Sequence, residues 1–308
     1  MTFRLGTRGS KLALAQAGLV RLALGAAHPG IEIETVVITT SGDWKPQDGE
    51  TRLSEQAGGK GLFAHEIEKS LLAGEIDFAV HSLKDMPSFL PEGLVIDHVL
   101  PRADARDAFI SHIARDVASL PRGAVVGTSS LRRQSIIMAA RPDLMIVPLR
   151  GNVETRLQKL KDGQVDATFL AMAGLNRLSI TGDMIHALPV EDMLPACGQG
   201  IVGIETRAGD TKTRAVLNSI HHAPTGLCAF AERAVLQILD GSCHTPIGAH
   251  AMLTGEQMIL RALVASPDGA TFYRDEYAAS VDTAAQAVSA GQTLGRRLKD
   301  VLPPGFLA

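Results

Sequence analysis

Aromatic side chains are scarce in this chain: tryptophan, tyrosine and phenylalanine make up 4% of its 308 residues, with a single tryptophan. Proteins that bind single-stranded nucleic acid stack the bases on interleaved aromatic side chains, and this composition argues against that class. A formal net charge of −3 and a sequence pI near 6.4 also argue against a general nucleic-acid binder. We therefore expect no nucleic-acid partner.

Cysteine is rarer still. The three cysteines, Cys197, Cys228 and Cys243, are odd in number and widely spaced, with no C-x-x-C pair and no zinc-like cluster with histidine. This usage fits neither a disulfide framework nor a structural metal site, and it favours a reducing compartment. The sequence thus predicts a cytoplasmic protein without a bound metal.

Long apolar runs are also missing. No stretch reaches the roughly 20 apolar residues that a membrane-spanning helix needs. Near the N-terminus, basic residues precede an Ala/Leu-rich run that superficially resembles a secretory signal, but Gln16 and Arg21 interrupt it. A helix that buries Leu12, Leu19 and Leu22 explains the run better. We expect neither a membrane span nor export.

Short strand-like runs alternate with helical segments through the first two thirds of the chain, which predicts α/β architecture with mainly parallel sheets. With 45% hydrophobic residues, the chain should form two or three domains. The last part differs, because a helix, two strands and another helix predict a small α+β unit. The expected strands are 3–5, 31–40, 78–80, 94–100, 124–127, 145–149, 167–170, 201–205, 259–265 and 271–278. The expected helices are 10–24, 62–72, 131–140, 153–162, 224–239 and 283–298.

A weak internal repeat links two of these strands. The segment Gly-Glu-Ile-Asp at 74–77 precedes one strand, and Gly-Gln-Val-Asp at 163–166 precedes another. Each glycine stands where it could end a helix before a buried strand. Two similar lobes with a cleft between them would produce this echo, and so would chance.

Arginine is concentrated in one part of the chain. Between Thr128 and Arg156 there are five arginines and only two acidic residues, and Arg132, Arg133 and Arg150 directly follow strand-like runs. A guanidinium group suits carboxylate or phosphate and keeps its charge when partly desolvated. This pattern predicts a cleft for a ligand with several negative charges, and the alternative is a solvated basic face.

Two glycine-rich segments match phosphate-binding motifs only superficially. Residues 198–203 have G-x-G-x-x-G spacing, but a proline precedes them and a strand-like run passes through their end, so we reject a dinucleotide site. Residues 58–61 lack the first glycine and the magnesium-binding Ser/Thr of a P-loop. Lys60 is then either an anion contact on the polar loop 42–61 or an ordinary exposed lysine.

Two other segments carry candidate chemistry. Residues 81–87 (HSLKDMP) follow a buried strand, where side chains of an α/β sheet commonly face a ligand crevice. Lys84 and Asp85 could instead pair with each other at the surface. Cys243 follows a helix on a tight segment, and it could be a nucleophile or attachment point or an inert packing residue.

Taken together, these segments resemble the hydroxymethylbilane synthase (porphobilinogen deaminase) family of tetrapyrrole biosynthesis. The matching stretches follow the family's order along nearly the whole chain, and their combination is specific although each alone is weak. They are residues 6–10 (GTRGS), 58–63, 80–87, 106–109 (RDAF), 127–134, 149–156, 198–205 and 241–248.

The resemblance implies three domains. Two α/β lobes like those of periplasmic binding proteins are formed by residues 1–100 with 199–218 and by 101–198, because the chain returns to complete the first lobe. Residues 219–308 form the small α+β domain that carries the cofactor cysteine. The family also suggests a monomer.

The resemblance further implies the reaction and its residues. Four porphobilinogen molecules lose ammonia in turn and are condensed onto a dipyrromethane joined by a thioether to Cys243, and hydrolysis then releases the linear tetrapyrrole hydroxymethylbilane. Asp85 is the expected catalytic residue, since a fixed carboxylate stabilises the positive charge that develops. The other expected cofactor-binding residues are Lys84, Ser82, Arg132, Arg133, Thr128, Ser129, Ser130, Arg150 and Gly151. The expected substrate-binding residues, which meet the acetate and propionate groups of each pyrrole, are Arg8, Ser10, Arg156, Arg177, Gln199 and Lys60.

One position departs from the family, because Gln56 stands about where a second basic residue is often found. Two other functions stay open at this point. A non-catalytic two-lobed binding protein for an anionic small molecule would share the architecture but leave Cys243 unexplained. A Schiff-base enzyme would use Lys60 or Lys84.

Overall fold

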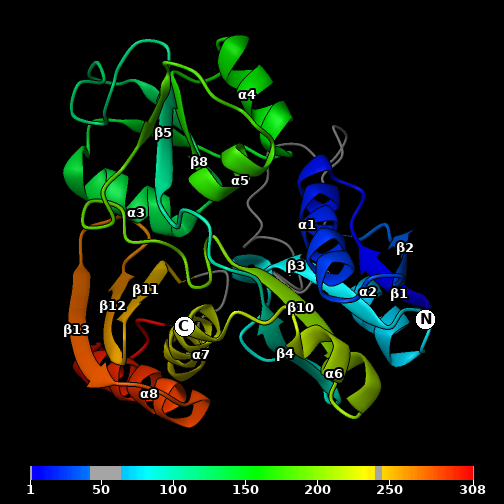
Figure 1. Ribbon diagram of the computed structural model, residues 1–308. Helices are drawn as coiled ribbons and strands as arrows, with labels where there is room; N and C mark the ends of the chain where they lie inside the picture. The colour runs from blue at the N-terminus through cyan, green and yellow to red at the C-terminus, as the bar shows by residue number, and fades with distance from the viewer. Residues whose placement is uncertain (1, 42–63, 240–244, 308) are drawn as a thin grey trace.

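The computed structural model describes residues 2–41, 64–239 and 245–307. They form two five-stranded sheets and one three-stranded sheet, each covered by helices (Figure 1). We call the unit around the first sheet the first lobe, the unit around the second sheet the second lobe, and the rest the C-terminal unit. The predicted α/β class with two lobes and a small C-terminal unit is confirmed, whereas the exact domain boundaries stay a prediction.

The first lobe has the strand order β2-β1-β3-β10-β4. Strand β10 runs against both of its neighbours, and the other four strands run the same way, so the sheet is mainly parallel. Its strands are β1 (Thr2–Thr7), β2 (Glu32–Val37), β3 (Phe78–Ser82), β4 (Leu94–Val99) and β10 (Val202–Arg207). Its helices are α1 (Lys11–Ala27), α2 (His65–Leu72) and α6 (Thr211–Asn218).

The second lobe repeats this plan with the order β7-β6-β8-β5-β9, in which only β5 runs against its neighbours. Its strands are β5 (Asp107–Ser111), β6 (Val125–Gly127), β7 (Met145–Val147), β8 (Ala167–Ala171) and β9 (Ile185–Ala187). Its helices are α3 (Leu131–Ala140), α4 (Val153–Lys161) and α5 (Met172–Arg177).

The sequence repeat marks equivalent turns in the two lobes. Gly74 and Gly163 have φ angles of 70° and 72°, which suit glycine. Three residues after each glycine, an aspartate accepts a hydrogen bond from a strand amide, at 2.7 Å from Arg4 N in the first lobe and 2.7 Å from Val125 N in the second. The echo therefore reflects two lobes of one design, as the sequence suggested.

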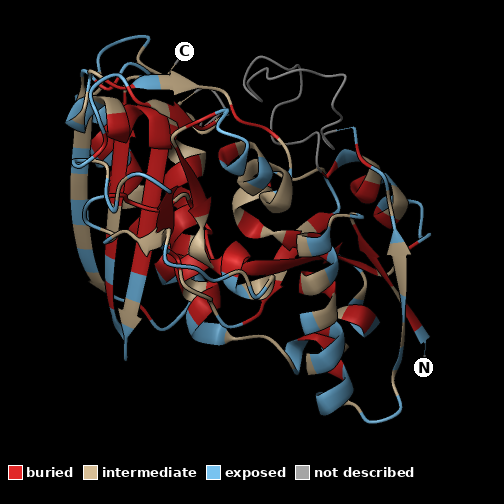
Figure 2. Ribbon diagram, turned by 90° about the horizontal axis from the view of Figure 1, so that it is seen from above, coloured by how far each residue is buried: buried red, intermediate tan, exposed pale blue. Residues whose placement is uncertain are grey.

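The C-terminal unit packs two helices on one antiparallel sheet. The sheet has the order β11-β12-β13, with β11 (Ile247–Thr254), β12 (Gln257–Ala265) and β13 (Phe272–Ser280), and the helices are α7 (Ala223–Ile238) and α8 (Ala284–Val301). The two helices approach so closely at Gly291 that a Cβ atom there would overlap the carbonyl oxygen of Ala231. Figure 2 shows the buried inner faces of these elements.

One buried ion pair joins the C-terminal unit to both segments that cross between the lobes. The Arg102 guanidinium lies 2.5 Å from Glu232, which is fully buried on α7. The same carboxylate accepts backbone hydrogen bonds from Gly198 and Ala251, each at 2.7 Å. Arg102 precedes the second lobe and Gly198 follows it, so α7 holds both connections at one point.

The face of α1 differs from the prediction. Leu19 and Leu22 are exposed, Leu12 is only partly buried, and the buried residues are Ala13, Gln16, Ala17, Val20 and Leu24. The predicted buried face was wrong because it was placed on the leucines that recur every third or fourth position. The helix instead packs against the sheet through a face that includes small residues such as alanine, which let it lie close. Several elements were not expected at all, namely β5, β9, α5, α6 and β11.

Among the described residues, no helix combines the length and apolar character needed to cross a bilayer.

Candidate functional site

Most of the predicted site residues follow the carboxyl ends of strands, where α/β sheets place their ligands. The first lobe contributes Arg8 and Ser10 after β1, and Ser82, Lys84 and Asp85 at the end of β3. The second lobe contributes Thr128, Ser129 and Ser130 after β6, and Arg150 and Gly151 after β7. Residues that are far apart in the sequence come together between the lobes, since Lys84 of the first lobe interacts with Arg133 of the second.

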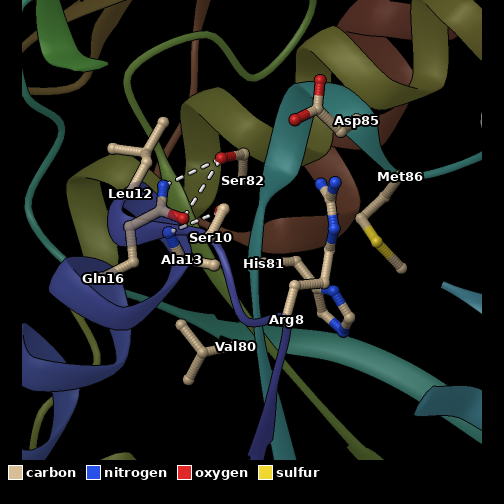
Figure 3. A pocket seen from close by; sticks show the side chains of 10 residues that line it. All are labelled: Arg8, Ser10, Leu12, Ala13, Gln16, Val80, His81, Ser82, Asp85 and Met86. Atoms are coloured by element: carbon tan, nitrogen blue, oxygen red, sulfur yellow. Dashed lines mark hydrogen bonds between the residues drawn. The ribbon is translucent and has the colours of Figure 1, made fainter. Parts of the chain in front are cut away.

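A pocket lies between the ends of β1 and β3 and the first turn of α1 (Figure 3). Asp85 occupies the short 3₁₀ turn Leu83–Asp85, and Met86 is extended with φ −80° and ψ 143°, as a residue before proline should be. In Figure 3 the Arg8 side chain extends toward the Asp85 carboxylate. The residues lining the pocket are Arg8, Ser10, Leu12, Ala13, Gln16, Val80, His81, Ser82, Asp85 and Met86.

The pocket is small, at about 60 Å³. Pockets that bury a drug-sized ligand have volumes of roughly 300–1,000 Å³, so this one suits a single ring or substituent of a larger ligand. One wall is fixed by Gln16, whose amide nitrogen donates a hydrogen bond of 2.8 Å to Ser82 Oγ. Gln16 interrupts an apolar run in the sequence, which could have marked it as a site residue, but no role was predicted for it.

Arg132 and Arg133 lie in the second lobe as a buried pair around one carboxylate. Asp107 Oδ2 is 2.7 Å from Arg132, and Asp107 Oδ1 is 2.6 Å from Arg133. Each guanidinium also donates to a backbone carbonyl, of Leu194 and Phe169 respectively. Both arginines were predicted from the sequence as site residues. No role was predicted for Asp107, although it lies in the RDAF stretch at 106–109.

Asp107 keeps its charge despite complete burial. Burial alone would raise the pKa of this carboxyl, but the two guanidinium groups outweigh it and hold the pKa well below its ordinary range. The cluster of two cations and one anion therefore keeps a net positive charge of one. Such a centre attracts carboxylates at the junction of the lobes.

Lys84 brings another basic group from the first lobe to this centre. Burial lowers its pKa to about 8, Asp85 and Asp107 oppose that shift, and the charges of Arg132 and Arg133 add to it. The interaction spans both lobes, since Lys84 follows β3 whereas the arginines begin α3. Lys84 thus stays mostly protonated at neutral pH and adds to the positive potential there.

Helices α1 and α3 begin in equivalent ways. Ser10 caps α1 by accepting a hydrogen bond from Ala13 N at 3.2 Å, and Ser130 caps α3 by accepting one from Arg133 N at 3.4 Å. Ser129 accepts from the Leu149 amide at 3.1 Å. Both helix N-termini lie beside the predicted site, where their partial positive charge suits an anion.

The segment after β7 needs glycine. Gly151 has a φ of 108°, and a Cβ atom there would lie 2.7 Å from Thr155. Its carbonyl accepts a 2.8 Å hydrogen bond from Arg156 Nε, which orients that side chain. Arg150, next to it, is 5% exposed. The turn thus carries Arg150, and its carbonyl orients Arg156 on the helix that follows.

Arg177 and Gln199 meet at the crossing between the lobes. Arg177 donates a 2.8 Å hydrogen bond to the Gly200 carbonyl, and desolvation lowers its pKa. The buried amide of Gln199 donates to Ala105 O at 2.7 Å and to Asp107 at 3.2 Å. Gln199 therefore contacts the Asp107 carboxylate directly, and its predicted contact with substrate stays a prediction.

Two predicted residues cannot be placed. Lys60, with the rest of the polar loop 42–61, and Cys243 both lie outside the described residues. Of the other cysteines, Cys228 is buried on α7, where burial raises the pKa of its thiol to about 11. Cys197 is also buried. Neither thiol is a reactive group of the kind expected for an attachment point.

The residues present fit an acidic, pyrrole-based group. Arg132 Nε and Arg177 Nε are buried and have no hydrogen-bond partner within the described residues. Buried N–H groups normally have partners, so these two donors need an acceptor that the described residues do not supply. Among the described residues, no group of three or more His, Cys, Asp or Glu side chains could hold a metal ion.

We predict that Arg133→Leu lowers the amount of bound dipyrromethane and shortens the enzyme-bound pyrrole chains, because leucine removes a charge and donors that its shape cannot replace. Intact mass of the purified variant measures both effects. Arg122→Leu is the matched control, since Arg122 is an exposed arginine of the second lobe. Equal occupancy and chain lengths in the two variants would contradict the assignment.

Comparison with known proteins agrees with the geometry. The family model described as "Porphobilinogen deaminase, dipyromethane cofactor binding domain" matches residues 3–215, and "Porphobilinogen deaminase, C-terminal domain" matches residues 226–300. The chain is similar to the porphobilinogen deaminase of Paracoccus denitrificans, with 49% identity over 98% of this chain and 95% of the relative. It is also similar to the chloroplastic porphobilinogen deaminase of Oryza sativa, with 46% identity over 98% and 85%.

Among solved structures, the periplasmic VFT2 domain of Bordetella pertussis BvgS matches 71% of this chain and 86% of its own, with 14% identity and a TM-score of 0.44. The two family models together cover most of the chain, and the relatives match it along nearly their whole length. This chain therefore belongs to the porphobilinogen deaminase family.

Proposed function

We propose that this protein assembles hydroxymethylbilane where its two lobes meet, with Asp85 as the catalytic carboxylate and Cys243 as the attachment point of its dipyrromethane. The protein is a transferase, a hydroxymethylbilane synthase that condenses four porphobilinogen molecules by deamination and releases the linear tetrapyrrole by hydrolysis. Its cofactor is a dipyrromethane. The single observation that carries the residue assignment is the position of Asp85, in a pocket beside the basic centre of both lobes.

When bound, the dipyrromethane supplies the pyrrole α-carbon that is the nucleophile for the first porphobilinogen unit. The residues that would hold it are Lys84, Arg132 and Arg133 with the hydroxyl groups of Ser82 and 128–130. Guanidinium groups bind carboxylates, and the Nε of Arg132 is a buried donor without a partner among the described residues. Gly151 gives the turn beside Arg150 its shape.

Asp85 has two tasks in this proposal. Its oxygens accept hydrogen bonds from pyrrole N–H groups and so orient the reacting ring in the pocket. Its negative charge also stabilises the positive charge that develops on porphobilinogen as ammonia leaves. A preorganised charge aimed at a developing charge of opposite sign lowers the barrier without reorganisation at the moment of reaction.

The remaining basic residues bind the carboxylates of the substrate. Each porphobilinogen brings an acetate and a propionate, so negative charge accumulates as the product grows. Arg8 lines the pocket of Asp85, and Arg156 and Arg177 approach from the second lobe. In the proposal these residues, with Ser10, Gln199 and Lys60, position each incoming substrate, and they neutralise charge that would otherwise oppose elongation.

The purified protein should carry a covalent dipyrromethane on Cys243, which intact mass, peptide mapping and the colour reaction with Ehrlich's reagent would detect. Cys243→Ser should abolish the thioether, because a hydroxyl group is a much poorer nucleophile than a thiol. Cys228→Ser is the matched control and should keep the adduct, since that thiol is buried. An unmodified mass in fully active protein would contradict the assignment.

The alternative of a non-catalytic binding protein for an anionic small molecule is not favoured, because the relatives share an enzyme name along nearly the whole chain. We also propose that the protein works as a monomer in the cytoplasm and binds no nucleic acid. The low cysteine content supports the compartment, and the slightly negative net charge supports the absence of a nucleic-acid partner. Light scattering on the purified protein would test the oligomeric state.

A further inference from the structure

A buried group of three ionisable side chains adjoins the pocket of Asp85. His81 on β3, Glu205 on β10 and Glu68 on α2 are 6%, 0% and 5% exposed. His81 Nε2 lies 3.0 Å from Glu205 Oε2. His81 also lines the pocket, next to Ser82 and on the same strand, so the group is in contact with the site (Figure 3).

The topology brings these residues together. Strands β3 and β10 are antiparallel neighbours, with Gly203 opposite His81 and Glu205 opposite Ala79. Gly203 has no side chain, so the imidazole of His81 can reach diagonally to Glu205. Helix α2 buries Glu68 against these strands. Strand β10, which follows α2 and β3 much later in the sequence, therefore completes the group.

The group has more hydrogen-bond acceptors than donors. Oε1 of Glu205 and Oε1 of Glu68 are both buried without a partner in the described part of the chain. A buried carboxylate without donors is strongly unfavourable. Protonation of one carboxyl removes part of this cost, because a carboxylic acid is a donor and carries no charge.

The charges lead to the same conclusion. Burial raises the pKa of Glu68 to about 7, the negative charge of Glu205 adds to this, and His81 opposes it. Other charged groups around these elements include Arg233 on α7, which interacts with Glu205, and Arg207 on β10, which donates to the Leu71 carbonyl of α2. Arg8 and Asp85 line the pocket beside His81. Glu68 thus interacts electrostatically with both Glu205 and His81.

We propose that His81, Glu205 and Glu68 form a buried site that holds one exchangeable proton beside the pocket and serves the proton transfers of the condensation. Each addition releases a proton from the α-carbon of the attacking pyrrole, and the departing ammonia takes up one proton to become ammonium, so one proton must move within the site per cycle. His81 is the member that adjoins the pocket, and Glu68 is the member that stores the proton. The inference rests on the proposed function for its role in turnover, but not for the protonation itself.

Glu68→Gln tests the role in turnover, because glutamine keeps the shape but cannot exchange a proton. We expect kcat to fall by about 10²-fold, the lower end for a proton-transfer group, and the ionisation near pH 7 to vanish from its pH profile. Glu66→Gln, on the same helix, should leave the profile unchanged, since Glu66 is held ionised by its hydrogen bonds. A Glu68→Gln profile that matches the wild type would overturn the role in turnover.

The protonation is tested without turnover. Infrared spectra of the wild-type protein should show a carboxylic acid band at pH 6 that is lost by pH 9 and is absent from Glu68→Gln. A raised pKa also makes the folded wild type lose stability as pH rises from about 4.5 to about 7, and this loss should be smaller in the variant. If the band and the pH-dependent loss are unchanged in Glu68→Gln, no proton is stored there. If both change but the kinetics do not, the site exists and its role in turnover is wrong.

Discussion

Asp85→Asn should leave a folded protein that carries its cofactor but has lost about 10²- to 10³-fold in kcat, the range found when one preorganised electrostatic group is removed. Asparagine keeps the size of the side chain and can still accept a hydrogen bond from a pyrrole N–H. It lacks the negative charge of Asp85, which lines the pocket and which we propose stabilises the developing cation. The rate of product formation at saturating porphobilinogen, with intact mass to confirm cofactor loading, measures the effect.

A matched control separates charge in the pocket from charge in general. Asp162→Asn makes the same chemical change at the exposed end of α4, where asparagine can still accept the hydrogen bond from Gln158. This variant should have wild-type kcat. Near-normal turnover of a loaded Asp85→Asn enzyme would show that another group stabilises the cation.

Asp107→Asn should be the most damaging change to stability. The substitution leaves two buried guanidinium groups without a counter-charge, and removing one partner from a buried ion pair typically costs about 3–5 kcal/mol in the free energy of unfolding. Urea denaturation monitored by circular dichroism measures the difference. Because Arg132 and Arg133 lose their common anchor, cofactor occupancy should fall as well.

Asp104→Asn is the control for this prediction. Its ion pair with Arg106 has a similar distance, 2.7 Å, but the two side chains are 22% and 45% exposed. Surface pairs contribute about 0–1 kcal/mol, so this variant should be nearly as stable as the wild type. Equal losses in the two variants would mean that the buried cluster has no special weight.

The pH dependence of stability tests the charge of the same buried cluster. The pKa of Asp107 is lowered in the folded protein, so its contribution is present above the unfolded pKa of about 3.9 and is lost as pH falls below it. The wild type should therefore lose more stability than Asp107→Asn between pH 5 and pH 3. Parallel curves for the two proteins would argue against the shift.

Local chemistry explains which elements could be predicted from the sequence. Helix α3 was expected at 131–140 and lies there, because Ser130 is a strong N-cap and short-range hydrogen bonds decide where a helix begins. The glycine turns at Gly74 and Gly163 were likewise expected. Strand β5 was missed, since its residues become a strand only by pairing with β8 and β9, which follow much later in the chain.

The candidate site divides in the same way. That basic residues and Asp85 follow strand ends could be read from the order of residues. The shared contact of Arg132 and Arg133 with Asp107 could not be read in this way, and neither could the contact of His81 with Glu205. These partners are 25, 26 and 124 positions apart in the sequence.

By itself, the sequence determined the family, the α/β class with a different C-terminal unit, and the residue types that border the site. Helix caps, glycine turns and strand ends depend on neighbours a few positions away. Only the tertiary structure decided which charges are neutralised in the interior and which stay available to a ligand. A charged side chain can stay buried only where the fold brings a partner of opposite charge or a hydrogen-bond partner to it. The order of the strands, with β10 beside β3 and β5 beside β8, decides which partners come together.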